Sequence, residues 1–403
     1  MLNIIIVLFL ILFLYNISLI YGFSSSFASS RGNINKYKNN LIMLSSSSSN
    51  IKTQEVFLLK EGGLAIQMLT TNPSAAAAAT NDDDDNSNSD SSIISKLNNI
   101  LSNINKNSNN RRKNDKNKQP ILFIHGSYHS AWCWAEEYFD YFSTMGHNCY
   151  AISLRGTSST GLPPGDTSST VKLKEHTSDV NFVLSKLIEI ENYNYNNNNN
   201  NNNNKDSSVK PIIISHSFGG LITMKLLEDD TVYNKIGGLV FLCSVPPSGN
   251  GDMTNRFLKE RFFAALRIVQ GFVFKAATTN IEVCRDLFFD ESVSDEDIRR
   301  YMRRFQADSR VGIDLRDVSS SLPSLKSDSN GKASFLNNDL YSINSLIIGA
   351  ENDYIVDTTG VIETAKFFNQ NPIFIKNLYH DIMLGPKAKY AADIIQEWIT
   401  NLE

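Results

Sequence analysis

A serine near the middle of the chain has the surroundings that a catalytic nucleophile requires. Ser217 stands between the apolar run 211–214 and the helix-forming run 220–227, so the sequence predicts a strand, a sharp turn and a helix with the serine at the apex. Such a turn exposes the hydroxyl, and the amino terminus of the helix stabilises negative charge beside it. Small residues must flank the crowded turn, and Ser215 and Gly219 occupy these positions. The segment therefore predicts a nucleophile elbow.

A serine nucleophile needs a general base, and the chain offers six histidines. They are His125, His129, His147, His176, His216 and His380. We predict His380 as the base, because it follows the last expected strand and so reaches the edge of the sheet that carries Ser217. His216 is adjacent to Ser217 but is expected to point to the other side of the turn. Of the remaining four, two flank the loop after the strand 121–124 and two are expected to be plain core or surface residues.

The acid that orients the base should follow a late strand at the same edge of the sheet. We predict Asp353, which comes shortly after the apolar run 343–348 and would hold the imidazole in the required tautomer. Glu351 and Asp357 are the alternatives, and an ordinary solvated loop acid is the competing interpretation of Asp353. Asp381 neighbours the base but is expected to be structural.

The oxyanion of an acyl-transfer intermediate needs preorganised hydrogen-bond donors. The segment His125-Gly126-Ser127 follows the strand 121–124, and Gly126 lets the backbone approach a reacting carbonyl. We predict that the backbone amides of Ser127 and Phe218 form an oxyanion hole, where each donor contributes roughly a few kcal/mol to the transition state. The competing interpretation is a simple strand-to-helix turn.

Strands alternate with helices over most of the chain, which predicts the α/β class with a mostly parallel, doubly wound sheet. The expected strands are 121–124, 148–154, 211–214, 238–243, 343–348 and 372–375, and the expected helices are 131–145, 171–191, 220–227, 360–368 and 387–402. A hairpin over 55–69 adds an antiparallel edge. Residues 249–340 break the alternation and are rich in helix formers. We expect them to form a helical cap over the carboxyl edge of the sheet, where ligands bind in such folds.

Composition divides the chain into segments. Runs of alanine, aspartate and asparagine bury too little apolar surface to fold, so they are expected to be disordered low-complexity insertions. The predicted segments are a signal peptide (1–22), a transit segment (23–54), the N-terminal β-hairpin of the core (55–71), a disordered insertion (72–119), the first part of the core (120–248) with an asparagine-rich insertion (196–204), the helical cap (249–340) and the last part of the core (341–403).

The N-terminal region predicts targeting rather than folding. An apolar stretch over 4–14, followed by smaller residues at 18–22, is typical of a signal peptide for the secretory pathway. From Phe23 to Ser49 the chain is rich in serine, contains basic residues and lacks acidic ones, as transit peptides do. The combination resembles the bipartite presequences of algae whose plastids lie inside the endomembrane system, which implies a plastid destination. Secretion and anchoring in the ER membrane are the alternatives.

Charge and cysteine usage narrow the expected partners. The formal net charge is −4 and no basic stripe with interleaved aromatic residues occurs, so nucleic acid is not an expected partner. The four cysteines form no C-x-x-C pair and no His/Cys cluster has zinc spacing, so we expect no metal, no cofactor and no disulfide framework. Aromatic and basic residues crowd the segment 256–275 of the expected cap. They form either a face packed on the core or a lid that lines an acyl pocket or contacts a membrane or lipid.

The chain resembles the α/β-hydrolase superfamily, because the order Ser217, Asp353, His380 matches the nucleophile, acid, histidine order of that family. The resemblance extends over 120–403 together with the hairpin 55–69. It implies a serine hydrolase of the carboxylesterase or lipase type, which cleaves the ester of a small molecule or of an apolar acyl group through an acyl-enzyme. A lyase or acyltransferase on the same scaffold and a non-catalytic small-ligand receptor are the alternatives.

One block of the sequence resembles a narrower branch of the superfamily. Residues 125–134, His-Gly-Ser-Tyr-His-Ser-Ala-Trp-Cys-Trp, are similar to the H-G-x-x-H-G-A-W-x-W block of the plant methylesterase and hydroxynitrile lyase branch. Ser130 stands where that block has a glycine, and the order His380-Asp381 replaces the Asp-His order common in that branch.

Overall fold

The computed structural model describes residues 44–45, 53–72, 118–198, 209–337 and 343–402 of the chain. These residues fall in one compact unit, Leu41–Glu403. The expected signal peptide, most of the expected transit segment and most of both expected insertions lie outside the described residues. Within the described ranges, no helix is both long enough and apolar enough to span a membrane.

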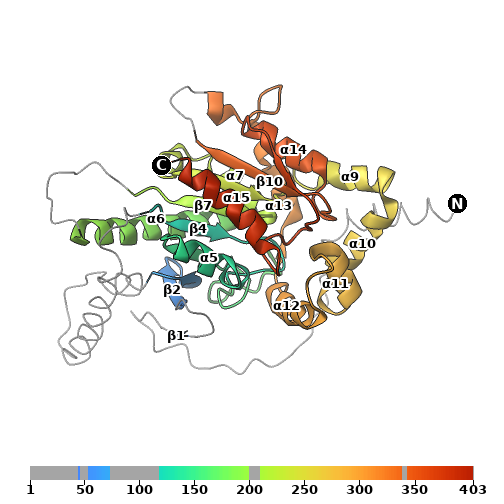
Figure 1. The fold of residues 1–403 in the computed structure, drawn as a ribbon, viewed down its shortest axis with the longest axis horizontal. Coiled ribbons are helices and arrows are strands. Elements are labelled where there is room, and N and C mark those ends of the chain that lie inside the picture. Colours follow the sequence, from blue (N-terminus) through green and yellow to red (C-terminus); the bar gives the residue numbers. More distant parts are fainter. Residues whose placement is uncertain (1–43, 46–52, 73–117, 199–208, 338–342, 403) are drawn as a thin grey trace. The chain divides into compact units, whose positions relative to one another are not determined.

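One sheet organises the described part of the chain (Figure 1). Among the described residues, nine strands lie in the order β1-β2-β3-β5-β4-β7-β8-β10-β11. Their bounds are β1 Leu44–Ser45, β2 Gln54–Lys60, β3 Leu64–Thr70, β4 Ile121–Ile124, β5 Cys149–Ile152, β7 Ile212–His216, β8 Gly238–Leu242, β10 Ser345–Ala350 and β11 Ile373–Ile375. From β5 to β11 every neighbouring pair is parallel, whereas β1, β2 and β3 form an antiparallel edge. The predicted α/β class with a mostly parallel sheet is confirmed.

The central strands are apolar along almost their whole length, as strands covered on both faces are. Every residue of β4, β7 and β8 is buried. The helices around them pack in pairs: α5 (Tyr138–Thr144) against α15 (Ala388–Thr400), and α6 (Leu173–Asn198) against α7 (Phe218–Leu226). A further helix, α14 (Thr358–Phe367), packs against β10.

The order in which successive strands are added to the sheet changes direction at β4. β5 lies on one side of β4 and β7 on the other, both parallel to it. At such a reversal, the loops from the carboxyl ends of the strands separate and leave a crevice where ligands bind. The loop after β4 begins at His125 and the turn after β7 begins at Ser217, so both segments with predicted chemistry flank this crevice. At the opposite edge Ile121 pairs with Ile212, so the amino ends of β4 and β7 are neighbours.

Between β8 and β10 the chain is mainly helical. The helices there are α9 Gly251–Glu260, α10 Phe262–Phe272, η1 Ala276–Thr278, α11 Ile281–Phe288, α12 Asp295–Asp308, α13 Leu315–Ser320, η2 Pro323–Lys326 and η3 Ser334–Asn337. α11 contacts both α10 and α12, and the three helices lie together in Figure 1. The Tyr128 hydroxyl, from the loop after β4, donates to the Phe272 carbonyl at the end of α10 (3.0 Å). The helical segment therefore contacts the loop that flanks the crevice.

Two segments differ from the expected helices. The single helix expected over 131–145 is two helices, α4 (Trp132–Ala135) and α5, because Glu137 between them has non-helical dihedral angles (φ −130°, ψ −46°). α6 continues past its expected end to Asn198, so the first asparagines of the run that was expected to be disordered are helical. Once a helix has nucleated, each added residue gains a hydrogen bond, which offsets the modest helix propensity of asparagine.

The sequence does not predict a second, two-stranded sheet. β6 (Thr170–Val171) pairs in parallel with β9 (Gly312–Ile313). Gly312 N donates to the Ser169 carbonyl and Asp314 N to the Val171 carbonyl, both at 2.8 Å. This pairing ties the far end of the helical segment to the chain just before α6. Strands of two residues have no periodicity, so no pattern in the sequence indicates them.

Gly219, in the first turn of α7, lies against the backbone at the end of β4. A Cβ added there would be 2.6 Å from the carbonyl oxygens of both Ile124 and His125. We expect Gly219→Ala to destabilise the fold by about 1–3 kcal/mol, because these are backbone atoms that cannot move aside. The matched control is Gly251→Ala in the first turn of α9, where a Cβ would meet nothing within 4 Å. Thermal unfolding should give a Tm several degrees lower for Gly219→Ala alone; equal Tm values would contradict this close packing.

Candidate active site

Ser217 occupies a strained turn between β7 and α7. Its φ of 51° and ψ of −121° are rarely adopted by residues with a side chain, which costs of order 1–3 kcal/mol. The surrounding backbone holds the turn in place. Ser217 N donates to the Leu242 carbonyl (3.1 Å), and the Ser217 carbonyl accepts from Gly220 N (3.0 Å) and Val245 N (3.1 Å). This is the geometry of a nucleophile elbow, in which the hydroxyl stands clear of the strand.

The loop after β4 passes directly beside Ser217. A Cβ added to Gly126 would lie 2.7 Å from the Ser217 Cβ, so only a glycine fits there. This close approach brings Ser127, which follows Gly126, near Phe218, which follows the serine. Within the described residues neither backbone amide donates a hydrogen bond, so both predicted oxyanion donors are available to a ligand oxygen.

His380 and Asp353 form a buried hydrogen-bonded pair. His380 lies in the loop after β11 and Asp353 in the loop after β10, and 2.8 Å separates His380 Nδ1 from Asp353 Oδ2. The other carboxylate oxygen accepts the amides of Ile355 (2.7 Å) and Val356 (2.9 Å), which fixes its orientation. Because Nδ1 donates to the carboxylate, Nε2 carries the lone pair of the neutral ring. The pair therefore has the geometry of a general base with its orienting acid.

The predicted base, His380, lies against the residue that precedes the predicted nucleophile. His216, which precedes Ser217, has its ring centroid 4.7 Å from that of His380, and its Nε2 is 3.0 Å from the His380 carbonyl oxygen. Among the described side chains no hydrogen bond joins Ser217 to His380; catalytic hydrogen bonds of this kind are often long until a substrate binds. The structure thus brings Ser217, Asp353 and His380 to one edge of the sheet.

The two alternative acids have different surroundings in the described structure. Asp357 caps α14 by accepting from Gly360 N (2.8 Å), and it forms an ion pair with Arg256 (2.7 Å). Glu351 is exposed. Neither carboxylate is hydrogen-bonded to His380 in the part of the chain that the structure describes, so the geometry favours Asp353 as the orienting acid.

A cysteine also faces the Asp353–His380 pair. Cys243 follows β8 with a positive φ of 44°, and its Sγ, an Asp353 carboxylate oxygen and a His380 ring nitrogen all lie within 4.8 Å of one another. Burial, and then the charge of Asp353, raises the pKa of the Cys243 thiol well above its usual value, so the thiol stays protonated. The sequence predicts only a buried apolar role for this cysteine, because nothing local shows that the ends of β8 and β10 are adjacent.

Two further histidines are buried without charge. The Nδ1 of His125 donates to the Gly126 carbonyl (2.7 Å) and its Nε2 accepts from Leu154 N (2.9 Å). Burial lowers the pKa of His125 to about 3 and the pKa of His176 to about 4. Both rings are therefore neutral at pH 7, and with pKa values this low they are weaker bases than an ordinary histidine.

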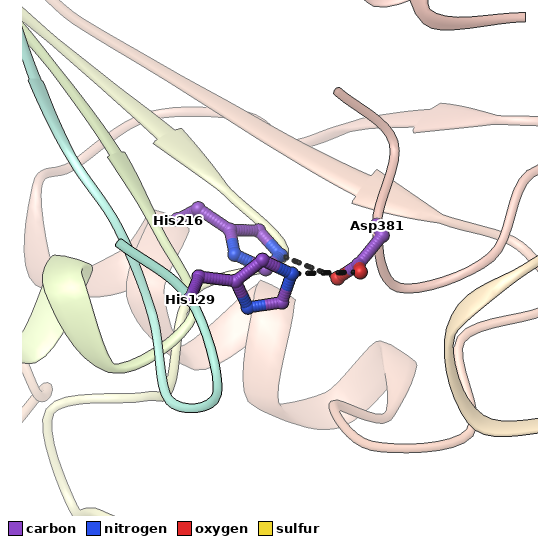
Figure 2. Close-up of side chains that lie close together, drawn as sticks. All are labelled: His129, His216 and Asp381. Atoms are coloured by element: carbon purple, nitrogen blue, oxygen red, sulfur yellow. Dashed lines mark hydrogen bonds and ion pairs between the residues drawn. The ribbon is translucent and has the colours of Figure 1, made fainter. Parts of the chain in front are cut away.

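His129 and His216 converge on a third buried residue, Asp381 (Figure 2). His129 Nε2 is 2.9 Å from Asp381 Oδ2, and His216 Nε2 is 3.7 Å from Asp381 Oδ1. His216 contacts the backbone carbonyl of His380, the predicted base, and among the described side chains no hydrogen bond joins it to the Ser217 hydroxyl. Sequence reasoning does not group these three residues, because they lie far apart in the chain and follow or end three different strands.

The sequence matches the family model for alpha/beta hydrolases over residues 121–392, which is more than half of the chain. The chain belongs to the α/β-hydrolase family. Solved structures agree at the level of the fold. An epoxide hydrolase from Vigna radiata has 13% sequence identity and a TM-score of 0.53, with 88% of this chain and 100% of that chain covered. A bromoperoxidase from Bacillus anthracis has 14% identity and a TM-score of 0.50, with 86% of this chain and 98% of that chain covered.

No protein of curated function matches the sequence of this α/β hydrolase. The predicted similarity to the plant methylesterase and hydroxynitrile lyase branch stays a prediction.

In this α/β hydrolase, Asp353→Asn should preserve the fold and disable the serine. The asparagine oxygen can still accept the amides of Ile355 and Val356, but its NH₂ group would then face His380 Nδ1 and force the wrong tautomer. We expect labelling of the protein by a fluorophosphonate at pH 7 to slow by roughly 10³–10⁴-fold. Asp357→Asn is the control and should label at the wild-type rate; equal rates for the two variants would refute Asp353 as the acid.

Buried neutral histidines should make the α/β hydrolase sensitive to acid. An unfolded histidine binds a proton below about pH 6.5, whereas His125 and His176 in the folded protein bind one only near their lowered pKa values of about 3 and about 4. The unfolded state therefore binds more protons in this window, and stability falls as the pH drops from about 6.5 towards 4. Each histidine contributes a slope of up to about 1.4 kcal/mol per pH unit. Denaturant unfolding of His176→Gln should show a shallower pH dependence than wild type; an identical slope would contradict the neutral assignment.

Proposed function

We propose that this α/β hydrolase cleaves a carboxylic ester, with Ser217 as the nucleophile and an acyl-enzyme as the intermediate. The observation that carries the proposal is the buried pair of Asp353 and His380, with 2.8 Å between Oδ2 and Nδ1, at the edge of the sheet where the strained Ser217 turn lies. An ester fits this set because its cleavage needs one nucleophile, one base that can return a proton and donors for one oxyanion.

In acylation, Ser217 Oγ attacks the ester carbonyl carbon while His380 Nε2 takes the hydroxyl proton. The carbonyl oxygen becomes an oxyanion, and the amides of Ser127 and Phe218 donate hydrogen bonds to it. Asp353 stabilises the imidazolium that forms. When the tetrahedral intermediate collapses, His380 gives its proton to the departing alkoxide. The alcohol leaves, and the acyl group stays on Ser217 as an ester.

In deacylation, water takes the place of the alcohol. His380 accepts a proton from the water as its oxygen attacks the acyl carbon, and the same two amides hold the second oxyanion. Collapse of this intermediate breaks the bond to Ser217 Oγ, which recovers its proton from His380. The products are a carboxylic acid and the free enzyme.

A small apolar hollow beside Phe218 supports an apolar acyl group. Its lining comes from α7, from the segment after β8 and from the β9–α13 region: Phe218, Leu221, Val245, Gly249, Asn250, Ile313, Leu315 and Val318. Phe218 lines this hollow and its backbone amide is a predicted oxyanion donor, so the hollow is our candidate for the acyl group. Apolar walls of this kind favour aliphatic or aromatic groups over charged ones. The proposed substrate is therefore an ester with a short apolar acyl group.

Ser217→Ala should abolish hydrolysis and leave the fold intact. The change removes only the Oγ, and the backbone bonds that hold the turn remain. We expect turnover of p-nitrophenyl butyrate to fall by roughly 10³-fold or more and labelling by a fluorophosphonate to disappear, with Tm nearly unchanged. Ser244→Ala is the control: this buried serine donates to the Val245 carbonyl (2.9 Å), so its loss should leave labelling in place.

The same assays separate the alternative functions. Labelling of wild type at a residue other than Ser217 would refute the nucleophile. Binding of short-chain esters without labelling or turnover would favour a small-ligand receptor. Release of an ester of an added alcohol, in place of the free acid, would favour an acyltransferase.

A further inference from the structure

A second group of buried ionisable side chains lies beside the proposed catalytic residues (Figure 2). The side chains of His129, His216 and Asp381 are at most 1% exposed. His129 lies in the loop after β4, His216 ends β7 and Asp381 lies in the loop after β11. Figure 2 shows both imidazole rings directed at the Asp381 carboxylate. The ester mechanism uses none of the three, so their presence needs a separate explanation.

Hydrogen-bond geometry determines the protonation of His129. Its Nδ1 is 2.8 Å from the Ser127 carbonyl oxygen and its Nε2 is 2.9 Å from Asp381 Oδ2. A carbonyl and a carboxylate only accept, and a neutral imidazole has a single N–H, so only the imidazolium donates to both. Burial by itself lowers the pKa of His129, but the charge and hydrogen bond of Asp381, the Ser127 carbonyl and the charge of Asp308 together raise it above its ordinary value. His129 and Asp381 are therefore a buried ion pair.

His216 is neutral within the same group. Its Nε2 is 3.0 Å from the His380 carbonyl oxygen and 3.7 Å from Asp381 Oδ1, so its one N–H is on Nε2. Among the described residues its Nδ1 has no hydrogen-bond partner, which suits an unprotonated nitrogen. Burial, and then the neighbouring His380 and His129, lower the pKa of His216 well below its ordinary value. The group thus carries one positive and one negative charge.

The ion pair connects two loops that the proposed mechanism uses. His129 holds the carbonyl of Ser127, whose own amide is a predicted oxyanion donor. Asp381 is the residue after His380, the proposed base. These loops leave β4 and β11, which are not neighbours in the sheet. Contact between His129 and Asp381 therefore joins parts that the sheet alone does not hold together.

We infer that His129 and Asp381 are positioning residues, whose buried ion pair holds the oxyanion loop against the loop of the base and keeps the Asp381 carboxylate from acting on His380 as an unpaired charge. The roles of the two loops rest on the proposed function, whereas the ion pair itself does not depend on it.

Charge balance gives the ion pair its effect on the base. His380 must be neutral before it takes the serine proton, and Asp353 then stabilises the imidazolium. An unpaired carboxylate on the next residue, Asp381, would stabilise the imidazolium further and so favour the protonated ring over the neutral one. The positive charge of His129 offsets the charge of Asp381, and Asp353 is the carboxylate that is hydrogen-bonded to His380.

Among the described residues, the other ionisable groups near the pair do not supply a positive charge in place of His129. They are His125 after β4, Cys133 in α4, His216 at the end of β7, Cys243 after β8, Cys284 in α11, Asp308 in α12, and Asp353 and His380 themselves. Burial lowers the pKa of His125 to about 3 and the pKa of His216 well below its ordinary value, so both rings are neutral, and burial raises the pKa of each thiol so that it stays protonated. Asp308 is itself an acid, held by Trp132 Nε1 (2.8 Å) and Ser158 N (2.7 Å). Within the described residues, the ion-pair contacts of Asp381 are with histidines alone.

The donor atoms of His129, His216 and Asp381 lie within 4.8 Å of one another, which is close enough to hold a metal ion. The hydrogen bonds favour the ion pair instead. A metal would need a lone pair on Nε2 of both rings. His216 Nε2 lies 3.0 Å from the His380 carbonyl oxygen, which only accepts hydrogen bonds, so this nitrogen carries a proton. Stoichiometric metal in the purified protein would overturn the inference.

Nitrogen NMR of the full chain tests the ion pair without reference to activity. In protein labelled with ¹⁵N-histidine, both ring nitrogens of His129 should carry protons at pH 7, whereas His216 should carry one. His129→Gln assigns the key resonances. His147→Gln is the control, because His147 also places Nδ1 2.8 Å from a carbonyl oxygen, that of Gln119, but it lies before β5 at the other edge of the sheet. A neutral His129 ring at pH 7 would overturn the inference.

The positioning role is tested by titrating His380 in the variants. His129→Gln removes the cation and keeps a hydrogen-bonding side chain, so the pKa of His380 should rise by about one unit or more. The acid limb of the kcat/KM profile for p-nitrophenyl butyrate should move to higher pH by the same amount. The double variant His129→Gln/Asp381→Asn removes both charges and should return the His380 pKa towards its wild-type value. His147→Gln should change neither quantity.

An unchanged His380 pKa in His129→Gln, with only a lower Tm, would show that the ion pair is purely structural. If His129→Gln does not fold, Asp381→Asn takes its place: loss of the carboxylate should lower the pKa of His129, and an unaltered value would overturn the inference. The NMR titration also keeps the two proposals apart. Absence of labelling and turnover in wild type would refute the ester hydrolase, while the shift of the His380 pKa would still decide the role of the ion pair.

Discussion

The close approach of two backbone segments at the carboxyl ends of β4 and β7 constrains the rest of the structure. Glycines at 126 and 219 make it possible, since a Cβ at either position would come within 2.7 Å of the facing segment. The contact sets the strained Ser217 turn against the loop that carries Ser127, and this determines where a reacting carbonyl could lie. The reversal of the chain at β4 and the contact of Tyr128 with α10 both converge on this edge.

Buried carboxylates also lie at this edge, and each one has hydrogen-bond partners close to it. A buried carboxylate without a partner costs several kcal/mol. Asp353 therefore faces His380 and two backbone amides, and Asp381 faces His129. These hydrogen bonds have preferred directions, which apolar packing lacks. The edge that carries the proposed chemistry is thus defined by directional contacts, on top of a sheet whose strands are held by apolar burial.

The sequence predicts the features that depend on residues close together in the chain. It does not predict those that depend on contacts between residues far apart in the chain. The fold class follows from apolar runs that alternate with helical patterns, and parallel strands then bring Ser217, Asp353 and His380 to one edge. The ion pair of His129 and Asp381 does not follow, because it needs the side-chain directions of two loops from non-adjacent strands.

The break between α4 and α5, the two-residue strands β6 and β9 and the contact of Cys243 with Asp353 are likewise tertiary features. No local pattern marks them.

The two expected insertions join the sheet at the edge away from the site. The insertion expected over 72–119 comes before β4 and the one expected over 196–204 comes before β7, and the amino ends of these strands meet through Ile121 and Ile212. Among the described residues, the printed hydrogen bonds of Ser217 and His380 are made at the opposite edge, by segments at the carboxyl ends of the strands. The length of either segment can therefore change without a direct change at the carboxyl ends of the strands, which Ser217 and His380 follow. The same separation makes both segments suitable places to insert a tag or a reporter domain.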